Sequence, residues 1–221
     1  PIALFAQFEN DGSNVYQLDS LIVSAENPYV LFPSSVEYID STTLQNFTNP
    51  LSLEGAMKLI PGVQINNRFN LAQGDKIQIR GIGSRAGFGV RGIKIILDGI
   101  PLTFTDGQSQ LNNLDLPNIH SIQVLKGPSS VLYGNSLGGA ILINSKINYS
   151  TKLNVSPQIL FGSFGLFRFG TSLNGNIKNS HFSLNVSKTE SKGFRDHSDA
   201  EFYNFNFLGN TRFSDLFTLS Y

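Results

Sequence analysis

Apolar and polar residues alternate with a period of two through most of residues 151–221. This period is the signature of β-strands whose two faces meet different surroundings. The polar face is mostly Asn, Ser, Gly and Gln, and aromatic residues recur on the apolar face, as in membrane barrels with a wet interior. A soluble sandwich shows the same alternation. The pattern predicts four antiparallel strands and the start of a fifth, at 153–162, 167–174, 182–187, 203–208 and 216–221.

Loop lengths give these strands a direction if they belong to an outer-membrane barrel, because such barrels have short periplasmic turns and longer outer loops. The longest and most charged connection is 188–200, whereas 176–180 and 209–214 are short. We therefore expect 188–200 to lie on the outer side. The turn 162–165 would lie on that side too, and its brevity is an exception.

The first 150 residues contain short apolar runs separated by Gly and Pro, which indicates an α+β domain. One short helix is predicted between an Asn-Pro start and a Pro-Gly end, with four apolar residues at helical spacing: Leu53, Ala56, Met57 and Ile60. Strands are predicted at 76–80, 93–97, 121–125 and 140–143. Together these elements suggest a small mixed sheet. The connections 81–92 and 127–139 are long and rich in glycine, which permits close backbone approach.

Composition excludes several classes of function. The chain has 16 basic and 16 acidic residues, so it lacks the basic excess of a nucleic-acid binder. It has no cysteine, hence no disulfide, thiolate metal site or cysteine nucleophile. Its three histidines, His120, His181 and His197, are dispersed, and no Ser/His/Asp set or carboxylate pair is visible. We therefore expect no enzyme activity, no cofactor and no protein-held metal.

The N-terminus resembles the end of an export signal. Residues 1–6 would be the remnant, cleaved after Ala6, and 7–17 would form a mobile segment. The stretch 127–145 carries no charge, but its glycine, proline and asparagine content rules out a membrane helix.

A series of short strings resembles, in order and with the right spacing, the TonB-dependent outer-membrane receptors. The segment Asp19-Ser20-Leu21-Ile22-Val23-Ser24-Ala25 is similar to their D-T-[LI]-V-V-T-A coupling box. The later strings are Ile60-Pro61-Gly62-Val63, Ile79-Arg80-Gly81, Leu97-Asp98-Gly99-Ile100-Pro101 and the run from Ile119 to Lys146. The resemblance covers residues 18–220.

This resemblance implies a plug domain at 18–147, containing a small mixed sheet and short helices. It implies that 151–221 form the first four to five strands of a transmembrane β-barrel, which has 22 strands when complete. The chain would then be truncated within the barrel. The residues expected to form the structural motifs of the plug are Pro61, Gly62, Arg80, Gly81, Asp98, Gly99, Gln123, Lys126, Gly127, Pro128, Tyr133, Gly134, Gly138 and Gly139.

Two of these residues depart from the family pattern. Gln123 stands where the family usually has Glu and cannot form an ion pair. Lys126 replaces the commoner Arg and cannot hold a carboxylate with two parallel hydrogen bonds. Both changes put an ionic latch at residue 123 in doubt.

The resemblance also implies active import of a scarce, large solute across the outer membrane of a Gram-negative bacterium. A ferric siderophore or other iron chelate is the leading candidate by family frequency alone. Energy would come from a TonB-like periplasm-spanning partner, which pairs edge-on with residues 19–25. The plug-loop residues expected to contact the extracellular ligand are Arg68, Phe69, Arg85, Phe88, Phe104, Asp106 and Gln108.

Other readings remain open at this point. Within the family, the solute could be cobalamin, haem or a glycan. Outside it, a passive barrel or adhesin embedded in outer-membrane lipid would explain the strands, although it gives no reason for the coupling box. In that case residues 21–23 would be an ordinary plug strand.

Overall fold

The computed structural model describes residues 35–46, 52–66, 74–87, 89–109, 111, 114–127, 133–134, 136–145, 153–214 and 217–220. By its internal contacts the chain divides into two units, Pro1–Pro33 and Ser34–Tyr221, so every described residue belongs to the second unit. Within this described part, no helix is long and apolar enough to cross a membrane.

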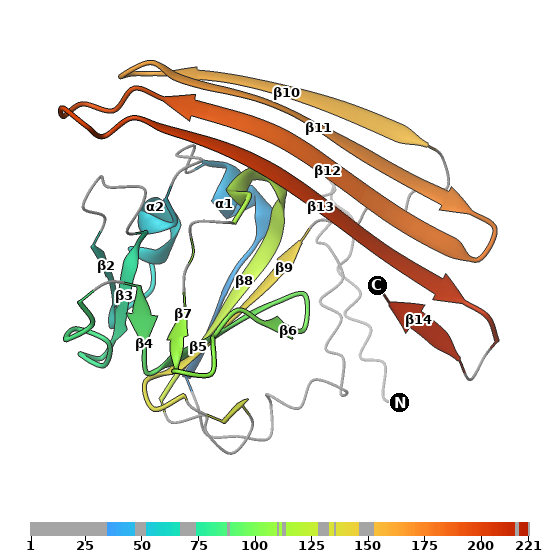
Figure 1. Cartoon of the computed structure of the whole chain (residues 1–221). Coiled ribbons are helices and arrows are strands. Elements are labelled where there is room, and N and C mark those ends of the chain that lie inside the picture. Colours follow the sequence, from blue (N-terminus) through green and yellow to red (C-terminus); the bar gives the residue numbers. More distant parts are fainter. Residues whose placement is uncertain are drawn as a thin grey trace, which may run out of the picture. The chain divides into compact units, whose positions relative to one another are not determined.

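A mixed sheet forms the centre of the first domain. The strands of this domain are β1 (Ser35–Ile39), β2 (Val63–Asn66), β3 (Lys76–Ile79), β4 (Val90–Arg91), β5 (Ile93–Leu97), β6 (Ile100–Pro101), β7 (Gln108–Ser109), β8 (Ile119–Lys126) and β9 (Gly139–Ser145). The five-stranded sheet has the order β1-β8-β9-β5-β6 (Figure 1), and β2–β3 and β4–β7 form two separate pairs. Strands β5 and β9 are parallel, whereas the other pairs are antiparallel. The predicted mixed sheet is confirmed.

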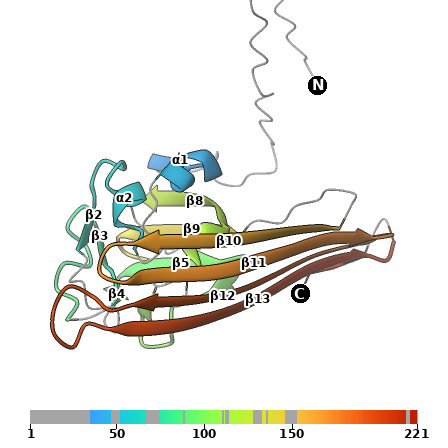
Figure 2. The ribbon, with the colours of Figure 1, turned by 90° about the horizontal axis from the view of Figure 1, so that it is seen from above.

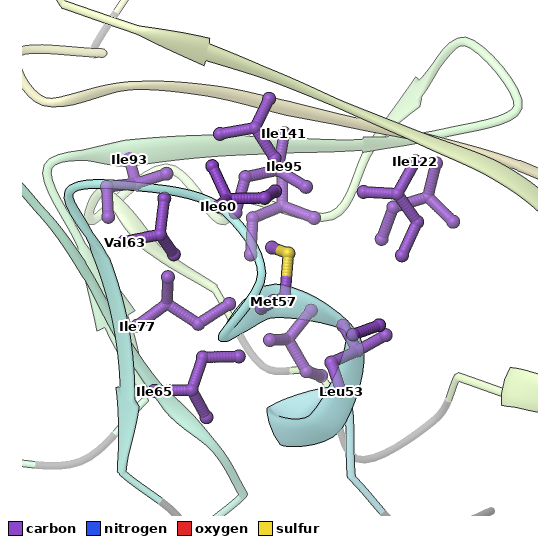
Figure 3. Packing of buried hydrophobic residues seen from close by; sticks show 14 of the residues in the cluster. Leu53, Met57, Ile60, Val63, Ile65, Ile77, Ile93, Ile95, Ile122 and Ile141 are labelled. Carbon is purple, nitrogen blue, oxygen red and sulfur yellow. The ribbon is translucent and has the colours of Figure 1, made fainter. Parts of the chain in front are cut away.

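The core of this domain lies between the sheet and one short helix. Met57 is fully buried and belongs to a cluster of apolar side chains that includes Ile65, Ile77 and Ile95 (Figure 3). Removing a side chain of this size from water contributes about 1.5–3 kcal/mol. Strand β9 is buried from Gly139 to Ile143, which explains its continuous apolar sequence. A strand covered on both faces needs apolar residues at every position rather than at alternate ones.

The predicted helix is present as α2 (Glu54–Met57), and all four of its predicted apolar residues are buried. The sequence predicts that this helix starts at an Asn-Pro pair. In the structure Ser52 and Leu53 are not helical, and the helix begins at Glu54. Buried Asp75 anchors this end by accepting hydrogen bonds from the Leu53 backbone N–H at 3.1 Å and from the Ser52 hydroxyl at 3.0 Å. A carboxylate at a helix N-terminus is favourably placed.

The helix α1 (Ser41–Asn46) was not predicted. Asp40 precedes it and accepts hydrogen bonds from the Thr42 hydroxyl at 2.6 Å and the Thr43 backbone N–H at 2.9 Å. The two bonds, that of Thr42 first, lower the pKa of Asp40 from 3.8 to about 2. This is an ordinary Asp cap, in which the ionised side chain satisfies a donor at the start of the helix.

A second, antiparallel sheet follows the first domain, and we call it the C-terminal sheet. Its strands are β10 (Asn154–Gly162), β11 (Leu166–Ile177), β12 (Ser180–Ser191), β13 (Ala200–Arg212) and β14 (Thr218–Ser220). They lie side by side in sequence order, and β10 to β13 are long (Figure 2). The five predicted strands are therefore present. Strand β13 continues through most of the turn predicted at 209–214, and β12 extends to Ser191, which shortens the predicted long loop to 192–199.

The C-terminal sheet is polar on its buried face and apolar on its exposed face. On β12, residues Ser183, Asn185, Ser187 and Thr189 are buried. On β13, Phe205 is 75% exposed and Tyr203 71% exposed. We call the buried, polar face the inner face and the exposed, apolar face the outer face. A water-soluble sheet has the opposite distribution, with its apolar face covered. The outer face therefore suits an apolar medium.

Candidate functional site

Three of the predicted motif loops meet at one end of the central sheet. The Arg80 backbone N–H donates to the Gly62 carbonyl at 2.8 Å, and the Lys126 ammonium donates to the Pro61 carbonyl at 3.3 Å. Arg80, Gly62 and Gly81 all have positive φ, which is easy for glycine and unusual for arginine. These motifs are far apart in the sequence but contact one another in the folded domain.

Lys126 has a carboxylate partner on a neighbouring strand. Its ammonium lies 2.9 Å from Glu37 Oε1, and its side chain is only 6% exposed. Gln123 lies on the same strand, opposite Tyr38 on β1 and Leu142 on β9. An ionic contact at Lys126 therefore exists without a glutamate at position 123, and β1 supplies it.

A second motif contact joins β5 to the end of β9. The Asp98 carboxylate accepts hydrogen bonds from the Ser145 backbone N–H and from its hydroxyl, both at 2.7 Å. Asp98 has a φ of 50° and Gly99 a φ of 82°, so the turn between β5 and β6 is left-handed at both positions. Asp tolerates this conformation better than most residues. The Leu-Asp-Gly string thus fixes the end of the parallel strand pair.

Replacing Asp98 by glycine should lower the free energy of unfolding by about 1–3 kcal/mol, because it leaves the Ser145 donors without their acceptor while still accommodating the positive φ. Asp98→Asn is the matched control, since it keeps one acceptor and tolerates the same φ. The measurement is urea unfolding followed by fluorescence. Equal stability of the two variants would show that these hydrogen bonds contribute nothing.

Two consecutive glycines at the start of β9, Gly138 and Gly139, allow close packing. An added Cβ at Gly139 would lie 2.0 Å from the Leu125 carbonyl oxygen, and one at Gly138 would lie 2.8 Å from the Ile82 side chain. A side chain at Gly139 is therefore incompatible with the β8–β9 pairing. Gly127 and Gly134 both have positive φ. Tyr133, which precedes Gly134, is among the described residues, while Pro128 is not.

The predicted ligand loops are described only in part. Arg68, Phe69 and Phe88 lie outside the described residues, as does the coupling segment Asp19–Ala25. Arg85 is exposed, and so is Phe104, at 62%. Within the part of the chain that the structure describes, no three His, Asp or Glu residues form a group that could hold a metal.

Two further predicted ligand residues are already engaged in the loop between β6 and β7. Asp106 accepts a hydrogen bond from the Gln108 backbone N–H at 2.9 Å and so closes the turn. The Gln108 side chain is buried, and its amide oxygen accepts from Arg91 at 3.5 Å. Phe104 and Arg85 are therefore better placed than Gln108 to meet a ligand, and all four roles stay predictions.

A cluster of polar residues connects the first domain to the C-terminal sheet, and we call it the Asp115 cluster. The sequence did not reveal it. The Arg168 guanidinium of β11 lies 2.7 Å from Asp115 Oδ1, and the Ser187 hydroxyl of β12 donates to Asp115 Oδ2 at 3.2 Å. Asn118, in the short 3₁₀ helix Leu116–Asn118, donates to the same carboxylate and accepts from the Ser172 hydroxyl at 3.1 Å. Both charged side chains are nearly buried, at 3% exposed for Arg168 and 10% for Asp115.

Comparison with known proteins shows which family has this architecture. Residues 31–140 match the family model described as TonB-dependent Receptor Plug Domain. The pesticin receptor of Yersinia enterocolitica is 28% identical over 134 residues, which cover 50% of this chain and 19% of that receptor. The ferrioxamine receptor of Yersinia enterocolitica is 28% identical over 171 residues, covering 77% of this chain and 22% of that receptor. The solved structure of pyoverdine-bound FpvA from Pseudomonas aeruginosa has a TM-score of 0.63 at 17% identity, over 83% of this chain and 24% of that one.

The chain therefore belongs to the TonB-dependent receptors, and residues 31–140 match their plug domain. It spans about a fifth of the length of these two curated relatives. The predicted fold class is confirmed, since a mixed-sheet domain with short helices precedes antiparallel strands. Both of these curated relatives are named as receptors.

Proposed function

We propose that this chain is part of an outer-membrane receptor that actively imports a large solute into a Gram-negative bacterium. The supporting observation is the C-terminal sheet, whose outer face is apolar and whose inner face is joined by polar contacts to the plug domain. A lipid bilayer favours an apolar exterior, and a wet interior favours the polar face. In this proposal residues 18–147 form the plug, and 151–221 are the first strands of the barrel.

The sheet needs further strands to remain in lipid. Strands β10 and β14 lie at its two edges, and unpaired backbone groups at an edge facing lipid cost several kcal/mol each. We propose that additional strands of a longer chain close the sheet into a barrel, as 22-stranded plugged transporters do.

The proposed energy source is a TonB-like partner that pairs with Asp19–Ala25. The segment has three consecutive apolar residues, Leu21, Ile22 and Val23, and precedes the first described strand. Strand addition at such a segment gives affinity through backbone hydrogen bonds, while side chains set the register. This mode of coupling needs no nucleotide in the outer membrane.

The proposed solute is an iron chelate of the siderophore class. This choice is supported by the ligands of the similar proteins, which include a ferrioxamine receptor and a pyoverdine-bound receptor. Exposed Phe104 and Arg85 are the described plug residues best suited to an aromatic or anionic ligand.

The deciding experiment measures uptake of radiolabelled ferric chelates and of cobalamin by cells that express the full-length gene product, with and without the energy-coupling partner. Partner-dependent accumulation of a ferric chelate supports the proposal, and accumulation of cobalamin alone would change the substrate. Passage that is indifferent to the partner would contradict active import and favour a passive barrel.

A further inference from the structure

The Asp115 cluster combines residues from two parts of the molecule. Arg168, Ser172 and Ser187 belong to the C-terminal sheet, whereas Asp115 and Asn118 belong to the plug domain. If the plug moves relative to the sheet, the first three residues stay together and lose their partners. The donors that remain on the sheet are one guanidinium N–H and two hydroxyl groups.

Neighbouring residues of the C-terminal sheet hold the Arg168 guanidinium in a fixed position. Gln158, Gly170 and Ser187 are register neighbours across β10, β11 and β12. The Gln158 amide oxygen accepts a hydrogen bond from Arg168 Nη1 at 3.2 Å, which leaves Nη2 for the carboxylate. An added Cβ at Gly170 would lie 2.9 Å from Arg168 Nη1 and 3.1 Å from the Ser187 Cβ. The glycine therefore provides the space in which the guanidinium lies.

A guanidinium in such a place needs an anionic partner. Arginine keeps its charge at any physiological pH, and a buried charge that loses its partner is strongly unfavourable. Planar guanidinium groups match the oxygens of carboxylates and related anions. The Asp115 carboxylate, which the structure places against Arg168 and Ser187, shows where such an oxygen sits.

We propose that Arg168, Ser187 and Ser172 form an anion-binding site on the barrel wall. While the plug is seated, Asp115 binds Arg168 and Ser187, and Asn118 binds Ser172; an anionic solute takes their place once the plug has moved. The solute class is one that carries carboxylate or catecholate oxygens. This inference rests on the proposed function, because it places the site on the path of the imported ligand. The solute would replace Asp115 and so compensate the charge of Arg168 during passage.

A first experiment tests the site itself and does not depend on transport. The full-length product carrying Asp115→Ala, in detergent, should melt at a lower temperature than the unchanged protein. Acetate, which reproduces the lost carboxylate, should raise the melting temperature in a concentration-dependent way, as expected for a ligand that binds only the folded state. Acetamide is the uncharged control, and Asp115→Ala with Arg168→Met is the control variant that lacks the guanidinium.

The result expected is a larger upward shift with acetate than with acetamide in Asp115→Ala, and no difference between the two additives when Arg168 is also replaced. Equal shifts in Asp115→Ala would overturn the proposal. If Asp115→Ala does not fold, Asp115→Gly, which also leaves the place of the carboxylate empty, is compared with the same additives.

A second experiment tests the role in transport with Asp115→Leu combined with Arg168→Met, a pair that removes both charges and leaves an apolar contact. Uptake of an anionic ferric chelate should fall about ten- to a hundredfold relative to that of a neutral chelate, the range for a hydrogen bond to a charged group. An equal change for both chelates would overturn the role in passage. Absence of partner-dependent uptake in the unchanged protein would instead refute the proposed function, and the acetate result would stand.

Discussion

Uptake should fall to background when Leu21 is replaced by proline, while binding of the ligand at the cell surface stays unchanged. Proline lacks a backbone N–H and fixes φ, so it removes a hydrogen bond from any strand that pairs with residues 19–25. The pairing with the energy-coupling partner would then fail at its centre. Ligand contacts are expected on the plug and barrel loops, which this change leaves in place.

The measurement is a parallel assay of surface binding and of energy-dependent accumulation, made on the same cells. Leu21→Ala is the matched control, because it shortens the side chain and keeps the backbone N–H. It should retain most of the uptake. Loss of binding together with uptake in the proline variant would mean that residues 19–25 are a structural strand of the plug, and unchanged uptake would exclude them as the coupling segment.

Replacing Phe205 by arginine should destabilise the assembled barrel by about 2–4 kcal/mol, the cost of a basic side chain at the middle of a bilayer. Phe205 lies near the middle of β13, and its side chain is 75% exposed. In water, the same substitution at an exposed position would change the free energy of unfolding very little. The size of the effect therefore reports the medium that covers the outer face.

The control for this prediction is Phe213→Arg. Phe213 is similarly exposed, at 64%, and lies just beyond the end of β13. Near the edge of the bilayer the cost falls to about 0–1 kcal/mol. Unfolding in urea from phospholipid vesicles measures both variants. Equal costs would contradict the assignment of Phe205 to the lipid-facing surface.

The elements that could be predicted from the sequence are those whose burial follows a local period. The C-terminal strands could be predicted because one face is consistently apolar. The core strands could be predicted because their apolar residues alternate, as in β3, or form a continuous run, as in β9. Strand β1 was missed because it is short and its outer residues Val36 and Tyr38 are exposed, so neither face is clearly apolar. Its register with β8 depends on contacts far along the chain.

The site could be predicted only where a motif string carried it. The strings around Arg80, Asp98 and Gly139 are explained by the contacts described above. The Asp115 cluster has no such string, because its two charged residues are 53 positions apart and meet only in the folded chain. A single arginine on the polar face of β11, among Gly, Ser and Asn, was the available signal. A buried charge needs a partner, but the amino-acid sequence alone does not show which residue is the partner of Arg168.

The polar inner face changes what counts as an improvement of this protein. In most domains a buried serine is a candidate for replacement by a larger apolar residue, which tightens the packing and raises the melting temperature. At Ser187, whose hydroxyl donates to Asp115 of the plug domain, we expect the same replacement to hold the plug more firmly against the strands. If the plug moves in each transport cycle, as proposed above, it depends on contacts that water can take over. Selection for heat resistance alone should therefore yield receptors with a higher melting temperature and a lower rate of transport.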